Sequence, residues 1–267
     1  MNKFLFFLLF VSFAFAKPSQ KIPEISTIAK KIFFIEKTIY STHHNIDYKI
    51  FIATNNTNAK EYKSIYLLDG NAFFPLFLNL FSKPIKENLL IIGIGYNTSL
   101  AFDTKNRTKD YTPDKQDGFE ESGGSENFRT FLKTQLMPYI EQYYPSDKNY
   151  KAIFGHSFGG LFALDTLLKD SKLFSHYFII SPSLWWNETK FLPQKIKLSS
   201  CPKIYFAMGS AERKRYALLS TKELSQKISQ ESSCKSSFKL FENETHGSVI
   251  NKAMIYAKEI FLKPSSP

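Results

Sequence analysis

Residues 150–164 read Tyr150-Lys-Ala-Ile-Phe-Gly155-His-Ser157-Phe-Gly159-Gly160-Leu-Phe-Ala-Leu, an apolar strand that leads through a G-x-S-x-G motif into an amphipathic helix. Glycines on both sides of the serine permit the sharp strand-to-helix turn that lifts its hydroxyl clear of a sheet. The helix N-terminus beneath it offers free backbone N–H groups. The motif by itself also fits an ordinary glycine-rich turn. Its position between strand and helix favours Ser157 as a nucleophile.

Segments of strand and helix length alternate on both sides of this motif. Two early segments, 31–40 and 46–53, are typical of an antiparallel pair of strands. Six further apolar runs are separated by helical segments, so the sequence predicts an α/β fold with a mainly parallel, eight-stranded sheet and helices on both faces. The six runs are 64–68, 89–94, 152–154, 177–180, 204–208 and 238–241, and the clearest helical segments are 126–143, 158–168, 216–229 and 249–262.

The first residues have the three parts of a secretory signal peptide. Lys3 supplies the positive start, residues 4–15 the apolar stretch, and Ala14-Phe15-Ala16 the cleavage site. We expect cleavage after Ala16, which leaves residues 17–267 as a single domain. An uncleaved anchor is the alternative, although the apolar stretch is short for a membrane span. No later segment is long and apolar enough to cross a bilayer, so we expect a soluble, exported protein.

The chain is basic, with 35 Lys and Arg residues against 24 Asp and Glu, a formal net charge of +11. Removal of Lys3 with the signal peptide leaves +10 (11 − 1). Such a charge favours anionic partners, with lysine that serves only solubility as the alternative. Nucleic acid is not a predicted partner, because the lysines are scattered and no basic block is interleaved with aromatic residues.

Arg107 stands out among the few arginines. It falls in a polar stretch, 96–125, that is too long for a plain connection. A long ordered loop at the end of a strand usually contributes to a site, whereas disorder is the alternative for such a composition. Because a guanidinium can hold an oxyanion at two points, Arg107 is a candidate binding residue.

Cys201 and Cys234 each lie just ahead of a predicted strand. If those strands are parallel neighbours, the two thiols begin side by side. In an oxidising compartment they would form a disulfide. Two free buried thiols are the alternative.

A serine hydroxyl needs a base to take its proton, and histidine has a suitable pKa. His246 follows the predicted strand 238–241 and precedes the last helix, which suits the base of a hydrolase sheet. The other four histidines are weaker candidates: His43 and His44 in a hairpin turn, His176 at the start of a strand, and His156, which the turn directs away from the serine.

The residue that orients the base should lie between serine and histidine in the chain order of this fold. Glu212 follows the strand 204–208 and is the candidate acid, with an exposed glutamate at a helix start as the alternative. Glu242 and Glu244 are weaker rivals. A dyad of serine and histidine without an acid also stays open.

Attack on an ester carbonyl builds negative charge on its oxygen, which requires preorganised donors. One candidate is the backbone N–H of Phe158, directly after the nucleophile. The other should come from the loop after the first core strand, which makes Gly70 or Asn71 the candidate, although Gly70 also fits a tight turn. The sequence contains no metal-ligand spacing and no phosphate-binding loop, so we predict no cofactor and no metal.

Several further motifs give the chain a family likeness. Taken together they resemble the bacterial putative-esterase family of α/β-hydrolases, and within it the periplasmic trilactone esterases of siderophores such as enterobactin. The likeness covers nearly the whole mature chain, and its Arg-x-x-Asp-Tyr-Thr-Pro and Ser-Gly-Gly segments are more specific than the serine motif. The motifs are Leu68-Asp69-Gly70-Asn71, Gly95-Tyr96-Asn97-Thr98, Arg107 with Asp110-Tyr111-Thr112-Pro113, Ser122-Gly123-Gly124-Ser125, Gly155–Phe162 and Ser181-Pro182-Ser183-Leu184.

The resemblance implies roles for individual residues. Ser157 and His246 would carry catalysis, and Arg107, with Tyr111 in the same segment, would contact an anionic catecholate substrate. Some trilactone esterases are described as dyads, whereas this chain offers Glu212. The pair Trp185-Trp186 is expected either to form an aromatic wall at the site or to pack in the core or on the surface.

The implied activity is hydrolysis, in the periplasm, of the ester backbone of a catecholate siderophore, with or without its iron. An anionic, aromatic substrate agrees with a basic protein that has aromatic residues near Arg107. A broader carboxylesterase of the same fold is one alternative. A non-catalytic siderophore-binding protein of the same fold is the other.

Overall fold

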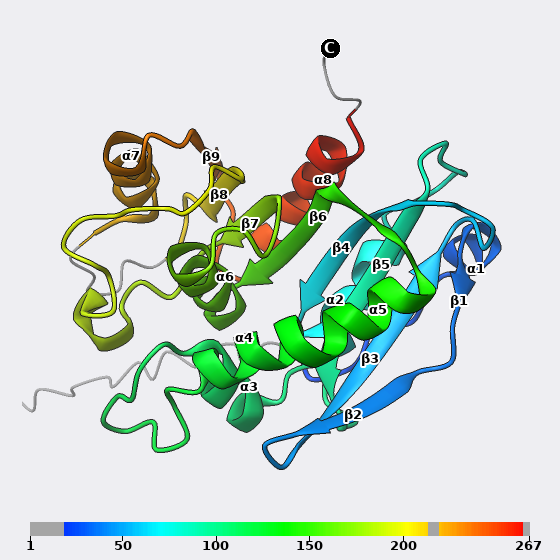
Figure 1. The fold of residues 1–267 in the computed structure, drawn as a ribbon, viewed down its shortest axis with the longest axis horizontal. Coiled ribbons are helices and arrows are strands. Elements are labelled where there is room, and N and C mark those ends of the chain that lie inside the picture. The colour runs from blue at the N-terminus through cyan, green and yellow to red at the C-terminus, as the bar shows by residue number, and fades with distance from the viewer. Residues whose placement is uncertain (1–18, 213–218, 264–267) are drawn as a thin grey trace, which may run out of the picture.

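The computed structural model describes residues 19–212 and 219–263, and its strands form one nine-stranded sheet (Figure 1). The strand order is β1-β3-β5-β4-β6-β7-β8-β9, with β2 paired to β3. From β5 to β9 every neighbouring pair is parallel, whereas β3 pairs antiparallel with β1, β2 and β5. The strands are β1 (Phe34–Ile35), β2 (Ile39–His43), β3 (Ile46–Thr54), β4 (Tyr62–Leu68), β5 (Leu89–Tyr96), β6 (Ser146–His156), β7 (His176–Ile180), β8 (Lys203–Gly209) and β9 (Ser236–Phe241).

The α/β architecture is as predicted, but the prediction of eight strands is wrong by one. The first predicted strand, 31–40, is divided into β1 and β2, which both pair with β3. Ile35 stands opposite Ala53 and Ile39 opposite Ile50, so three residues of one chain segment face two of the other. One extra residue of this kind forms a β-bulge, which interrupts the ladder.

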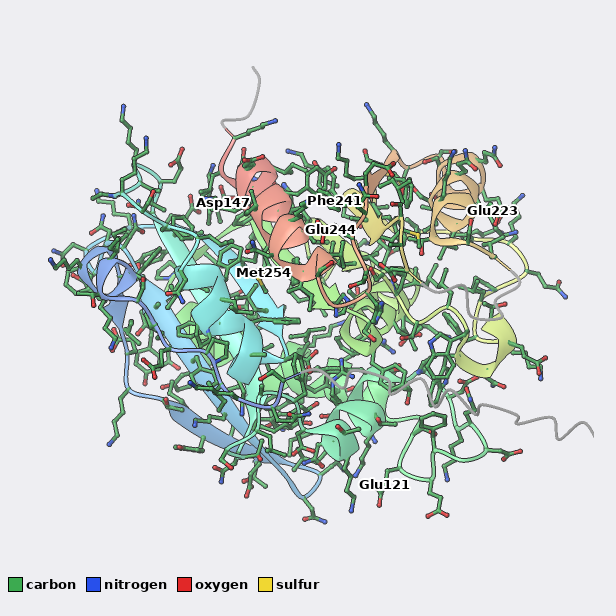
Figure 2. All side chains as sticks on the ribbon, turned by 180° about the vertical axis from the view of Figure 1, so that it is seen from behind. Glu121, Asp147, Glu223, Phe241, Glu244 and Met254 are labelled. Atoms are coloured by element: carbon green, nitrogen blue, oxygen red, sulfur yellow. A yellow bond between two sulfur atoms is a disulfide. The ribbon has the colours of Figure 1, made fainter. Side chains whose placement is uncertain are left out.

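Helices cover both faces of the sheet. One face packs against α3, α4, α6 and α7, and the other against α1, α2 and α8, so that each face has its own apolar core. In Figure 1 α3 to α6 lie in front, and in Figure 2, from behind, α8 with Met254 lies in front of the sheet. The helices are α1 (Thr27–Ile32), α2 (Gly70–Leu78), α3 (Thr104–Tyr111), α4 (Ser125–Phe131), η1 (Leu132–Leu136), α5 (Met137–Tyr143), α6 (Phe158–Lys169), η2 (Trp186–Thr189), α7 (Thr221–Ser232) and α8 (Val249–Leu262).

Two of the predicted helices have internal or terminal features of their own. The helix predicted over 126–143 is present as α4, η1 and α5, and its middle turn is a π-helix. Pro138, which has no N–H and clashes with the carbonyl four residues earlier, follows that wide turn. Of the helix predicted over 216–229, residues 216–218 lie outside the described part of the chain, and α7 begins at Thr221, where Ser220 and Glu223 form a capping box.

Some predictions fall on parts of the chain that the structure does not describe. The signal peptide, 1–16, lies outside the described residues. Within residues 19–212 and 219–263, none of the helices combines the length and apolar character needed to cross a bilayer.

The predicted disulfide between Cys201 and Cys234 is present. Cys201 precedes β8 and Cys234 precedes β9, and these strands are parallel neighbours that pair from Ile204 opposite Ser236. The two thiols therefore start side by side, as the sequence indicated. The bond encloses α7 within its loop.

Replacing both cysteines with serine should lower the free energy of unfolding by about 3–4 kcal/mol, because a bond across this separation of 33 residues restricts the denatured chain. Urea unfolding followed by circular dichroism measures the change. The reduced wild type serves as the control and should match the double variant. Equal stability of oxidised wild type and double variant would contradict the prediction.

Candidate active site

Ser157 occupies the sharp turn that the sequence predicted. β6 ends at His156 and α6 begins at Phe158, so Ser157 alone forms the turn, with φ 60° and ψ −118°. The chain passes so close to itself that a Cβ on Gly155 would lie 2.1 Å from the carbonyl oxygen of Gly159. A Cβ on Gly160 would lie 2.6 Å from the carbonyl oxygen of Ile180. Glycine is therefore required on both sides of the candidate nucleophile.

The N-termini of α2 and α6 meet beside Ser157. They follow the adjacent parallel strands β4 and β6, and a Cβ on Gly159 would lie 3.5 Å from Oδ2 of Asp69. The first N–H groups of a helix have no partner within it, which leaves those of Phe158, Gly70 and Asn71 available. These are the three predicted oxyanion donors. Two helix N-termini at one point also favour negative charge there.

The side chain of Asn71 has a structural task. Its amide donates to the carbonyl oxygens of Tyr96, Thr98 and Leu100, at 3.0 to 3.2 Å, and accepts from the N–H of Tyr96. These bonds fix the turn that follows β5. Only the backbone N–H of Asn71 therefore remains as a candidate oxyanion donor.

Glu212 and His246 lie together at the ends of β8 and β9. Oε2 of Glu212 is 2.8 Å from Nδ1 of His246, and its Oε1 accepts from Ser181 Oγ at 2.5 Å and from the N–H of Gly209 at 2.8 Å. Burial alone would raise the pKa of Glu212, but the hydrogen bonds from His246, Ser181 and Gly209 hold the pKa below its usual value. The carboxylate is thus ionised and oriented beside the imidazole.

The rival acid Glu244 is engaged elsewhere. Its carboxylate pairs with Lys252 and accepts from Ser248, and these contacts lower its pKa. The other rival, Glu242, is exposed. Of the three glutamates, Glu212 is the one that contacts Nδ1 of His246 in the described part of the chain.

The hydroxyl of Ser157 points toward Ser183, with 3.4 Å between the two Oγ atoms. No direct hydrogen bond joins it to His246 among the described residues. The segment that carries His246, between β9 and α8, is here called the base loop. It lies next to the turn at Ser157, because the ring of the preceding residue, His156, is 4.5 Å from that of His246. Proton transfer requires the Ser157 hydroxyl to leave Ser183 and turn toward His246.

His156 was predicted to point away from the serine, and its ring packs against that of the candidate base, His246. His156 is buried, and among the described atoms its Nε2 has no hydrogen-bond partner. Burial, and then the charges of His246 and Arg107, hold the pKa of His156 well below its usual value. A neutral ring can contact His246 without repelling the imidazolium that forms during proton transfer.

Arg107 differs from its prediction in two ways. It lies in α3 rather than in an open loop, and its Nε and Nη2 donate to the two carboxylate oxygens of Asp69 at 2.8 and 3.0 Å. The side chains of Arg107 and Asp69 are 12% and 1% exposed. Its guanidinium also lies 5.4 Å from the ring centre of Phe158. Two of its donors are thus already used within the protein.

Tyr111 was predicted to contact substrate, and this prediction is wrong for the structure observed. Its ring is fully buried against Phe128 and Phe162, since α3 packs on α4 and α6. Its hydroxyl accepts the N–H of Asp69 at 3.1 Å. Tyr111 and Arg107 therefore hold the same residue, Asp69, which has a left-handed backbone (φ 52°) directly before Gly70.

The two neighbouring tryptophans differ in burial. Trp186 is fully buried and its indole N–H donates to Oδ1 of Asp114 at 2.8 Å, so its predicted contact with substrate is wrong and its packing alternative holds. Trp185 is half-buried and lies 6.0 Å from Phe119 and 5.7 Å from Phe158, measured between ring centres. It remains a candidate for the aromatic wall.

Sequence reasoning missed Asp69, Ser181 and Ser183 as site residues. Asp69 directly follows β4, and Ser181 directly follows β7. Polar residues at the carboxyl ends of parallel strands meet at one edge of the sheet. That position was the signal that could have found them.

Substitution of Arg107 with lysine should lower kcat for a simple aryl ester about 10-fold to 100-fold, with KM nearly unchanged. Lysine cannot hold both oxygens of Asp69, so Gly70 and its N–H lose their fixed place. Steady-state kinetics with p-nitrophenyl acetate measures both constants. A raised KM at constant kcat would instead indicate direct substrate binding by Arg107.

Arg129→Lys is the matched control for that variant. Arg129 is also buried and paired with an aspartate, Asp165, at 2.8 Å, but this partner lies seven residues beyond Phe158 in α6 (165 − 158), away from the N-terminus of that helix. The Arg129→Lys variant should have a lower free energy of unfolding than the wild type and an unchanged kcat.

Glu212→Gln should lower kcat about 10²-fold to 10⁴-fold, since the amide keeps the shape of the side chain but removes the charge that stabilises an imidazolium. Glu244→Gln is the control and should retain activity, because Glu244 pairs with Lys252. Hydrolysis of p-nitrophenyl acetate at several pH values measures both. Equal activity of Glu212→Gln and the wild type would favour a dyad.

Comparison with known proteins identifies the family of the chain. The family described as "Putative esterase" matches residues 41–250. The ferri-bacillibactin esterase BesA of Bacillus subtilis is 32% identical over 257 residues, covering 85% of this chain and 89% of that protein. The apo-salmochelin esterase of Escherichia coli O6:H1 is 35% identical over 186 residues, covering 64% of this chain and 58% of that protein.

A solved structure shares the fold over most of the chain. The enterobactin and salmochelin hydrolase IroE superposes with a TM-score of 0.71 at 29% identity, covering 89% of this chain and all of that one. IroE has also been solved in complex with DFP. From its match over residues 41–250 and its identity to BesA, the chain belongs to the putative esterase family and is a serine ester hydrolase of the α/β-hydrolase fold.

Proposed function

We propose that the protein hydrolyses the ester bonds of a catecholate siderophore with a trilactone backbone, such as enterobactin. The observation that carries the chemistry is the contact between Glu212 and His246 beside the strained turn at Ser157. The substrate class is supported by relatives whose names specify bacillibactin, salmochelin and enterobactin. Those names support a siderophore ester over a general carboxylic ester.

In the proposed reaction Ser157 Oγ attacks the ester carbonyl carbon and His246 takes the hydroxyl proton. The backbone N–H groups of Phe158 and Gly70 donate to the oxyanion, and Glu212 stabilises the imidazolium. His246 then returns the proton to the leaving alkoxide, which departs as an alcohol. A water molecule attacks the acyl-enzyme by the same route, releasing the acid and restoring Ser157.

The surroundings of the site suit an anionic aromatic substrate. Trp185, Phe119 and Phe158 form an aromatic surface beside Ser157. The net charge attracts anions, since it is +10 once residues 1–16 are removed (11 − 1). We place the mature protein, residues 17–267 as one domain, in the periplasm because residues 1–16 have the pattern of a signal peptide.

The mature protein should convert iron-free enterobactin stepwise into linear trimer, dimer and monomer, whereas Ser157→Ala should produce none of them. Chromatographic product analysis follows the three species. Ser157→Ala should still bind enterobactin, which separates loss of the nucleophile from loss of folding. Cleavage of simple aryl esters by the wild type without cleavage of enterobactin would leave the serine mechanism intact and reject the siderophore.

A further inference from the structure

A cavity of about 690 Å³ lies beside the base loop, on the side of the sheet covered by α2 and α8. Half-buried Leu76, Phe102 and Ile250 supply its apolar surface, each from a different part of the chain. Exposed Lys21 and Glu24 add a charge of each sign. Its volume is in the range of small-molecule sites, which combine apolar walls with a few polar groups.

The N-terminal wall of this cavity is fixed at both ends. The carbonyl oxygen of Gln20 accepts from the N–H of Ala101 at 2.9 Å, and its side-chain oxygen accepts from the N–H of Phe102 at 3.0 Å. At the other end Asn79 donates to the carbonyl oxygen of Glu24 and accepts from the N–H of Ser26, both at 2.8 Å. Residues 20–26 therefore form a preformed wall.

Three residues that line the cavity lie next to residues of the candidate active site. Gly247, which lines it, directly follows His246. Phe73, also in the lining, has its ring 6.3 Å from that of His156, which contacts His246. Phe102 lies 5.9 Å from the guanidinium of Arg107. A ligand in the cavity would thus contact Gly247, the residue that follows the candidate base.

The two apolar surfaces lie on opposite faces of the sheet. Phe102 and Leu76 pack on the core of one sheet face, whereas Trp185 and Phe119 pack on the core of the other. Ser157 follows β6, a central strand, at the carboxyl ends of the parallel strands. An ester likewise has two sides, and in a trilactone of repeated units both the acyl side and the alkoxy side carry an aryl arm.

We propose that this cavity is the subsite for one aryl arm of the substrate, while the surface around Trp185 contacts the arm on the other side of the scissile ester. The inference rests on the proposed function. Phe102 and Leu76 would contact the ring, and Lys21 at the cavity would attract the anionic oxygens of a catecholate. The substrate would thereby contact residues from both faces of the sheet, at the carboxyl ends of its strands.

Leu76→Trp tests the subsite by placing an indole ring in it. The variant should lower kcat/KM for iron-free enterobactin at least tenfold, mainly through KM, and leave hydrolysis of ethyl acetate unchanged, because that ester has no aryl arm. Leu76→Met, which conserves volume, is the matched control and should behave as the wild type. A change of less than twofold on enterobactin in a folded Leu76→Trp protein would overturn the proposal.

Lys21→Glu provides a second test that does not depend on core packing, because Lys21 is exposed. It should lower kcat/KM for enterobactin about threefold or more. Lys172→Glu, an exposed lysine between α6 and β7 at the opposite edge of the sheet, should have no effect. Equal kinetics of the two lysine variants would overturn the proposal. Failure of the wild type to cleave enterobactin would reject the proposed function itself.

Discussion

The close approach of backbone to backbone around Ser157 determines where every other group of the site must lie. A serine with φ 60° costs on the order of 1–3 kcal/mol, so the surrounding chain must hold it there. Its N–H donates to the carbonyl oxygen of Ile180, and its carbonyl oxygen accepts from the N–H groups of Leu161 and Ser183. The turn is therefore tied to α6, which it starts, and to β7, the neighbouring strand.

β7 also connects the nucleophile to the acid. Ile180 accepts from the N–H of Ser157, and the next residue, Ser181, donates its hydroxyl to Glu212. The N–H of Ser181 binds the carbonyl oxygen of Ala207 in β8, the strand that leads to Glu212. Two consecutive residues thus fix the distance between nucleophile and acid, which explains how the acid is held in place beyond the end of β8.

The strands and the candidate nucleophile and base could be predicted because their signals are local. Runs of apolar residues marked β4 to β9, and Ser157 and His246 stood at strand ends. α2 gave no such signal: nearly all of its residues are buried, so it has no polar face and no helical period in its sequence. The sequence did not predict α3 either, for the opposite reason: its residues are nearly all polar, so it has no apolar stripe.

Burial of individual site residues could not be predicted, because it depends on packing between distant segments. Tyr111 was expected to contact substrate, yet α4 and α6 enclose it. For Trp186 the sequence left a site wall and core packing both open, and the side chain is directed inward to Asp114. Arg107 was predicted as a site residue, and its guanidinium lies 5.4 Å from the ring centre of Phe158. Its bidentate partner, Asp69, lies 38 residues earlier in the chain and shares no local pattern with it.

The buried pair of Arg107 and Asp69 is better explained by geometry than by stability. Removing two charges from water costs several kcal/mol per ion, which the attraction between them roughly offsets, so such a pair contributes little net stability. A planar fork with two parallel hydrogen bonds does, however, define both position and angle. Here it fixes the left-handed residue before Gly70, and its guanidinium lies 5.4 Å from the ring centre of Phe158. One guanidinium thereby contacts both segments that supply the candidate oxyanion donors, and that contact, rather than a free positive charge, accounts for an arginine at this position.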